Sequence, residues 1–129
     1  MVRKGDVLNP SCPSRQVLDR IGEKWTTLVI RVLDDGTLRY SDLQRRVGGV
    51  SQQMLTQTLR GLERDGLVAR HVYPVVPPRV EYSLTPLGRS LVQPLDAMCR
   101  WAERHLPEML QARSRNDRKE PRRAEARTL

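Results

Sequence analysis

Residues 51–67 decide the fold, and they read SQQMLTQTLRGLERDGL. Serine is a preferred helix N-cap, and Ser51 stands directly before the segment with helical periodicity. Three leucines then repeat at three- and four-residue spacing, which predicts one buried helix face: Leu55, Leu59 and Leu62. Gly66 suits the left-handed position that closes a helix in a Schellman motif. The stretch therefore predicts a helix over residues 51–65 with one buried face and one polar face.

A second helix is predicted just upstream, from Ser41 to about Val47. Ser41 would be its N-cap, and Gln44 would complete a capping box. The Gly48-Gly49 pair separates this helix from the one over 51–65. Two helices joined by a tight turn that contains glycine, the second with a polar outer face, form the helix-turn-helix pattern.

A β-hairpin is predicted directly after these two helices. Residues 68–73 read as one strand, and three alternating apolar residues read as a second: Val80, Tyr82 and Leu84. The loop between them, residues 74–78, is PVVPP, and proline cannot donate to a sheet ladder. A hairpin in this place is the wing of a winged helix-turn-helix. The predicted fold class is therefore mainly α with a small β-hairpin wing.

Further helices are predicted on both sides of this unit. One opens at Cys12-Pro13 and ends near Ile21, and another over residues 23–33 has its apolar residues on one face. Thr85-Pro86 begins the last helix, whose apolar stripe continues to Leu106. This stripe is long for so small a domain. We therefore expect a second subunit to cover it, with the protein dimerising through its N- and C-terminal helices.

The expected organisation is a flexible arm over residues 1–11, one domain over 12–111 and a disordered basic tail over 112–129. The chain has 129 residues, and its net charge of +8 and pI near 10.5 favour a polyanionic partner such as nucleic acid. No apolar run approaches the roughly 20 residues that span a membrane, and the first residues lack the apolar segment of a secretory signal. The expected location is the cytoplasm.

The same residues resemble a known family. Four stretches resemble the HxlR-type helix-turn-helix regulators: Cys12-Pro13 to Lys24-Trp25, Arg39–Leu43, Ser51–Gly66 and above all residues 73–88 (YPVVPPRVEYSLTPLG). The resemblance covers about residues 12–110. It implies a dimeric bacterial DNA-binding regulator, related in architecture to the MarR group. Members of the family often have a basic residue where Gln53 stands here, so their base and phosphate contacts at that position do not transfer.

The polar face of the helix over 51–65 is the predicted DNA-reading surface. Its outward residues are Ser51, Gln52, Gln53, Thr56, Gln57 and Arg60. In a helix-turn-helix such a face enters the major groove, and glutamine pairs with N6 and N7 of adenine. We expect the three glutamines at base edges, with Thr56 and Arg60 at the backbone or an adjacent base. The alternative is a merely solvated helix face.

Three residues outside this helix are also expected to touch DNA. Arg79 closes the wing, where it would reach a phosphate or the minor groove. Arg39 and Ser41 would contact phosphates from the first helix of the motif. A solvated hairpin charge is the alternative for Arg79, and capping alone would explain Ser41.

Cys12 is a candidate sensor of oxidants or electrophiles. It stands at a predicted helix start, where the helix dipole favours a thiolate, and Arg15 would add to that effect. The family resemblance also implies sensing at this place, since several members are thought to sense reactive species through a cysteine here. The alternative is a packing role, which is the prediction for Cys99. A small-molecule effector is a further alternative to an oxidant.

The predicted function is a sequence-specific transcription regulator, most simply a repressor, whose homodimer reads a pseudo-palindrome in double-stranded DNA. The sequence has no phosphate-binding glycine loop, no nucleophile elbow and no metal-ligand spacing at its cysteines or histidines, so neither an enzyme nor a cofactor is expected. Two alternatives stay open. One is a winged-helix module that binds protein, and the other is a non-specific architectural DNA binder.

Overall fold

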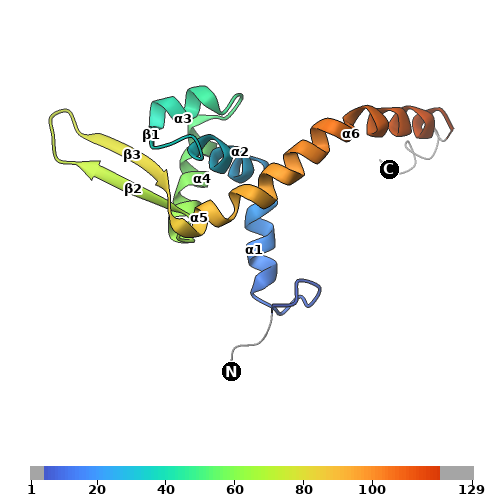
Figure 1. Ribbon diagram of the computed structural model, residues 1–129, viewed down its shortest axis with the longest axis horizontal. Helices are drawn as coiled ribbons and strands as arrows, with labels where there is room; N and C mark the ends of the chain where they lie inside the picture. The colour runs from blue at the N-terminus through green and yellow to red at the C-terminus, as the bar shows by residue number, and fades with distance from the viewer. Residues whose placement is uncertain (1–4, 120–129) are drawn as a thin grey trace. The chain divides into compact units, whose positions relative to one another are not determined.

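A computed structural model describes residues 5–119 (Figure 1). Its elements, in chain order, are α1 (Ser14–Ile21), α2 (Lys24–Leu33), β1 (Leu38–Arg39), α3 (Tyr40–Arg46), α4 (Gln52–Arg64), β2 (Val68–Tyr73), β3 (Arg79–Leu84), α5 (Pro86–Ser90) and α6 (Val92–Lys119). One compact unit ends at Leu95, and a second begins at Asp96 within α6. The first unit holds the helix-turn-helix and the wing, as the sequence predicts.

The core of the first unit lies beneath α4. Leu55 and Leu62 are completely buried and Leu59 is almost so, which confirms the predicted leucine face. They belong to a core cluster with apolar residues of α2 and α3, among them Ile30 and Leu43. Ser51 caps α4 as predicted, because its hydroxyl oxygen accepts the backbone N–H of Met54 at 3.1 Å.

The end of α4 has the predicted Schellman geometry. Gly66 has a φ of +76°, its N–H donates to the Glu63 carbonyl at 3.1 Å, and the Leu67 N–H donates to the Leu62 carbonyl at 2.9 Å. The Thr85 hydroxyl donates to the Gly66 carbonyl at 2.6 Å. These bonds join the end of α4 to the start of α5.

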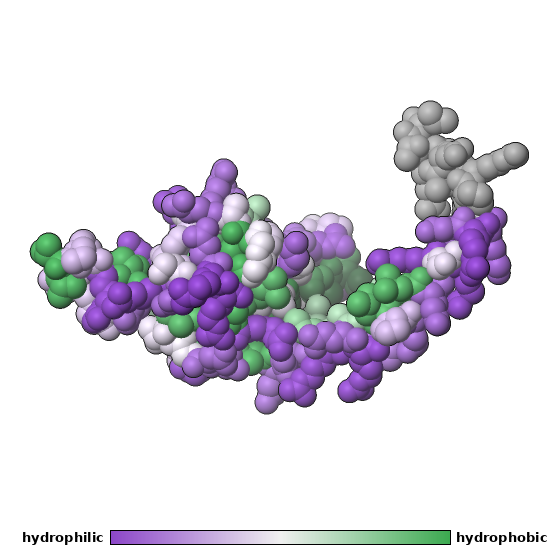
Figure 2. Space-filling view, turned by 90° about the horizontal axis from the view of Figure 1, so that it is seen from above, coloured by the Kyte–Doolittle hydropathy of each residue, from purple (hydrophilic) through white to green (hydrophobic). Residues whose placement is uncertain are grey.

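The wing is part of a three-stranded antiparallel sheet with strand order β1-β3-β2. Tyr82 is the central residue, with Leu38 opposite it on one side and Arg70 on the other. Opposed residues project to the same face of a sheet, so Arg70 and Tyr82 share one face. The closing loop is apolar, with Val76 fully exposed, and it forms the apolar group at the hairpin end in Figure 2.

The structure corrects the predicted start of the first motif helix. α3 begins at Tyr40 with Arg39 as its N-cap, and no side chain caps it. Arg39 is held extended because it pairs with Glu81 in the sheet, so the chain turns into the helix one residue early. Ser41 therefore lies in the first turn and does not form the predicted capping box.

The last helix also differs from the prediction, in two ways. It is divided into α5 and α6 at Leu91, because Pro94 has no N–H to continue the ladder and its ring would clash with the Ser90 carbonyl four residues earlier. In addition, α6 continues through residues 112–119, where the sequence predicts a disordered tail. Alanine, arginine and lysine are strong helix formers, and five of these eight residues are of these types, which favours the extension. The rest of that tail lies outside the described residues.

A glycine in α5 provides a test of how closely this element packs. A Cβ on Gly88 would overlap the carbonyl oxygen of Leu67, and that oxygen belongs to backbone that cannot move aside cheaply. We expect Gly88→Ala to lower the free energy of unfolding by about 3 kcal/mol, measured by urea denaturation. The control is Gly48→Ala, where a Cβ meets nothing within 4 Å and the change should stay within about 0.5 kcal/mol. Equal stabilities for both variants would contradict the close packing.

Candidate nucleic-acid interface

The exposed side of α4 gathers most of the predicted DNA contacts in one place. A shallow hollow on this side is lined by Gln52, Gln53, Thr56, Gln57 and Arg60, which we call the reading face. All of them are exposed except Thr56, which is half-buried. Ser51 is exposed at the start of the helix, where its oxygen is engaged in capping. The structure thus presents amide and guanidinium groups together on one rigid helix.

Tyr40 holds the start of this helix against the helix before it. Its hydroxyl oxygen lies 2.8 Å from the carbonyl oxygen of Gln52 and 2.9 Å from the Thr56 hydroxyl. Sequence reasoning missed this role, because Tyr40 stands just before the helix that the sequence predicts from Ser41. A signal was available, since the side chain is amphipathic and stands at the junction of two elements.

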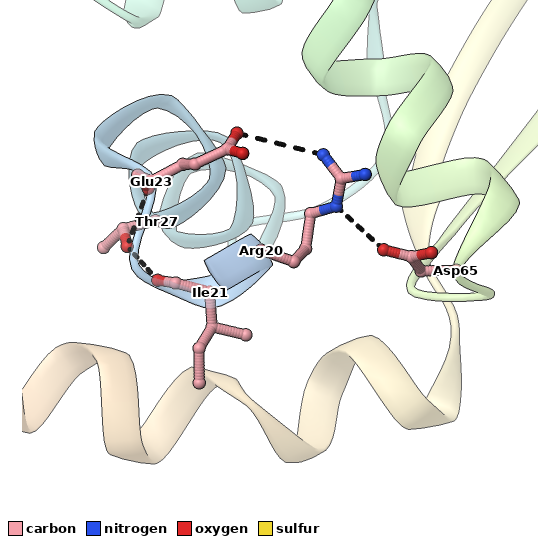
Figure 3. A network of polar contacts seen from close by, with 5 residues as sticks. All are labelled: Arg20, Ile21, Glu23, Thr27 and Asp65. Atoms are coloured by element: carbon pink, nitrogen blue, oxygen red, sulfur yellow. Dashed lines mark hydrogen bonds and ion pairs between the residues drawn. The ribbon is translucent and has the colours of Figure 1, made fainter. Parts of the chain in front are cut away.

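The end of the same helix is held by α1 (Figure 3). The Arg20 guanidinium donates to Asp65 with an Nε–Oδ2 distance of 2.8 Å, and its Nη1 lies 3.8 Å from Glu23. The side chain crosses α4 at Gly61, where a Cβ would approach Nη1 to 2.5 Å. Thr27 donates to the Ile21 carbonyl at 3.3 Å and so satisfies one free carbonyl at the end of α1. The recognition helix is therefore fixed near both ends.

The other predicted contacts lie apart from the reading face. Arg39, Ser41 and Arg79 line a separate groove between the start of α3 and the wing loop. Arg39 and Ser41 are exposed. The Arg79 guanidinium lies over the Tyr73 ring at 4.3 Å, and its Nε is 3.6 Å from Glu81. Arg79 is thus oriented by its own hairpin.

A second cavity lies beside the reading face, between α4 and the sheet. Its lining residues are Tyr40, Thr56, Leu59, Arg60, Glu63, Arg70 and Tyr82. Among residues 5–119, neither Arg60 nor Arg70 has an ion-pair partner. Sequence reasoning missed Arg70, because a strand residue next to a wing carries no signal until the sheet register places it against the helix. We call this the side cavity.

Cys12 lies in the turns that precede α1. Its sulfur accepts the Asp6 backbone N–H at 3.2 Å and lies 2.9 Å from the Ser14 hydroxyl. These hydrogen bonds, the Asp6 N–H first, lower the pKa of the thiol below its ordinary value. Arg15, which the sequence suggests as a further contributor, is not among the groups that lower this pKa, and its Nε donates to the Val7 carbonyl at 3.1 Å. Cys99 is a free, half-buried cysteine.

The described residues contain no cluster of three or more histidine, cysteine or acidic side chains that could hold a metal ion. Each histidine has another neighbour: His71 packs edge-on against Tyr73, and His105 lies 3.0 Å from Glu108. Over residues 5–119, every helix is too short or too polar to cross a membrane.

Comparison with known proteins shows the family to which this chain belongs. The model of the HxlR-like helix-turn-helix family matches residues 20–110. The chain belongs to the HxlR-like helix-turn-helix family. It is therefore a DNA-binding transcriptional regulator and not an enzyme, and the resemblance read from residues 12–88 is confirmed.

Individual members of the family are similar over most of the chain. The HTH-type transcriptional regulator YtfH of Escherichia coli (strain K12) is 47% identical over 112 residues, which cover 87% of this chain and 89% of YtfH. The structure of the transcriptional regulator ytfH from Salmonella typhimurium has a TM-score of 0.80 at 48% identity, covering 86% of this chain and 99% of that one. The redox regulator HypR in its oxidized form has a TM-score of 0.66 at 44% identity, covering 71% and 95%.

The hydrogen bonds at Cys12 of this HxlR-like protein predict the pH dependence of its alkylation. In a Cys99→Ser background, iodoacetamide should react with Cys12 at a lower pH than with an ordinary cysteine, because the thiolate is the nucleophile. Ser14→Ala removes one hydrogen bond that favours the thiolate, so the midpoint of the rate–pH profile should move up and the rate at pH 7 should fall. Ser11→Ala, which leaves both contacts in place, is the control. A midpoint that does not respond to Ser14→Ala would show that this bond does not set the pKa.

Proposed function

We propose that this HxlR-like regulator is a cytoplasmic homodimeric repressor that reads a pseudo-palindromic operator through the reading face and the wing. The observation that carries the proposal is the gathering of three glutamines and an arginine on one exposed helix face that is fixed near both ends. Glutamine and arginine side chains match the donor and acceptor pattern of the major groove. A dimer that occupies a promoter represses most simply by excluding other proteins.

Exposed apolar side chains support the dimer. In α1 no residue is buried, and Val17 is 59% exposed. The described part of α6 beyond Leu95 likewise exposes large apolar side chains, and Figure 2 shows hydrophobic surface along this helix. Trp101 is 55% exposed. Apolar faces of this kind are typical of subunit interfaces. A two-fold dimer would present two recognition helices about one turn of DNA apart.

Cys12 is proposed as the sensor of this regulator. Its sulfur is held by hydrogen bonds that favour the thiolate, and HypR, a similar structure, is described as a redox regulator. Cys12 lies two residues before the start of α1, and the other end of α1 holds the recognition helix through Arg20 and Asp65. Modification of Cys12 would therefore act on an element that positions the reading face.

The polar character of the reading face favours DNA over the two alternatives. A protein-docking surface would expose apolar residues at its centre, and this face exposes amides. An architectural DNA binder would depend on lysine and arginine, whereas Arg60 is the single cation that lines this hollow. The expected ligand is therefore a particular DNA sequence.

A selection experiment tests the proposal. Genomic fragments bound by the purified protein should share a sequence with two half-sites about one helical turn apart, or a multiple of it. Diamide with glutathione should then abolish binding: two thiols give up two electrons and two protons to the N=N bond of diamide, and Cys12 forms a mixed disulfide. Cys12→Ser should be insensitive, whereas Cys99→Ser should respond like the wild type. Specific binding that diamide does not change would exclude only the role of Cys12 as a sensor. Bound fragments without a shared sequence would exclude sequence-specific operator binding.

The side cavity provides a charge test of the proposed DNA contact. We expect Arg60 and Arg70 to face a phosphate there, with Glu63 opposing it. Arg70→Gln should weaken binding to all sequences alike and reduce the slope of log K against log salt by about 0.9, the value for one phosphate contact. Glu63→Gln should instead tighten binding. Arg64→Gln, an exposed α4 arginine outside the cavity, is the control, and equal effects of all three variants would contradict a phosphate at this place.

A further inference from the structure

We infer that Thr56 is an acceptor site for an exocyclic amino group of a base, N6 of adenine or N4 of cytosine, and that Tyr40 imposes this polarity. The inference rests on the proposed function, since it names what one residue of the reading face accepts. Its basis is a pair of contacts made by one hydroxyl group. The Tyr40 oxygen lies 2.8 Å from the Gln52 carbonyl oxygen and 2.9 Å from Thr56 Oγ1.

The protons of this small network can be assigned from its chemistry. A tyrosine hydroxyl has one proton, and a carbonyl oxygen can only accept. The contact with Gln52 therefore takes the proton of Tyr40. In the contact between the two hydroxyls, Tyr40 is then the acceptor and Thr56 the donor.

A threonine hydroxyl in a helix has another common acceptor, and Thr56 cannot use it. Such a side chain often donates to the carbonyl four residues earlier, which for Thr56 is again the carbonyl of Gln52. That oxygen has two lone pairs. One accepts the helical N–H of Thr56 and the other accepts Tyr40, so neither is left for the Thr56 hydroxyl.

What remains at Thr56 is an oxygen with lone pairs and no proton to give. Thr56 is half-buried and lines both the hollow of the reading face and the side cavity. Phosphate oxygens, guanine O6 and N7 and thymine O4 are all acceptors, so they offer it no hydrogen bond. The donors in the major groove are the amino groups of adenine and cytosine. Thr56 is thus a base-reading residue and not the backbone contact that its sequence position allowed.

The test uses the operator selected by the wild-type protein and a set of operators in which each position carries each base. The wild type should prefer adenine or cytosine at one position of each half-site by about fivefold, the effect of one neutral hydrogen bond. Thr56→Val should abolish this preference and no other. Thr56→Ser should keep it, because the hydroxyl is retained. Thr37→Val, an exposed threonine away from the hollow, is the control.

The Tyr40→Phe variant tests whether Tyr40 sets the direction of the Thr56 hydrogen bond or only supports the helix. Without the tyrosine oxygen the Thr56 proton becomes available, so guanine or thymine at the same position should be accepted within about twofold of adenine or cytosine. The other positions should keep their preferences. If this variant does not fold, as judged by its melting transition, the Thr56→Val and Thr56→Ser pair decides alone.

Three results would overturn the inference. One is a wild-type preference for guanine or thymine at the position that Thr56→Val affects. Another is a loss of affinity in Thr56→Val that is equal for all sequences, which is the signature of a phosphate contact or a structural role. The third is an unchanged preference in Tyr40→Phe. Should the wild type select no sequence at all, the proposed function itself fails, and this outcome is distinct from the other three.

Discussion

Burial of the leucine face of α4 is the constraint on which the rest of this structure depends. Leu55, Leu59 and Leu62 are removed from water against α2 and α3, and each buried leucine contributes on the order of 2 kcal/mol. The polar side chains of the same helix are then directed outward by its 3.6-residue period. Burial of the leucine face therefore both stabilises the fold and directs Gln52, Gln53 and Gln57 outward. No further interaction is needed to expose these glutamines.

Burial alone leaves a helix free to slide or rotate slightly, and polar contacts at its ends remove that freedom. Tyr40 ties the first turn to α3, and Arg20 ties the last residues to α1. The Schellman turn and Thr85 then join α4 to α5. Of the reading face, only Thr56 and the backbone carbonyl of Gln52 take part in these contacts, so most of the atoms that hold α4 differ from those that it displays. Thr56 belongs to both, which is why the direction of its hydrogen bond affects what it can read.

Two groups of arginines can likewise be distinguished, those paired within the protein and those that line the side cavity. Arg20, Arg46 and Arg79 are engaged with carboxylates of the protein itself. Arg60 and Arg70 are left without ion-pair partners in the described part of the chain, and both line the side cavity. An anionic ligand in the side cavity would meet both of these guanidinium groups.

The sequence by itself determined most of the elements, though not all of their bounds, and the outward face of α4. Ser51, the leucine spacing and Gly66 are local signals, because caps, periodicity and left-handed residues act within one or two turns. The hairpin and Thr85-Pro86 were predictable for the same reason. Tertiary structure decided the rest. Arg39 starts α3 early only because it pairs with Glu81, and Arg70 meets the side cavity only through the register of β2 on β3. The proton of Thr56 is assigned by Tyr40, 16 residues away. Contacts between distant segments leave no periodic trace in a sequence, since their geometry exists only after the chain has packed.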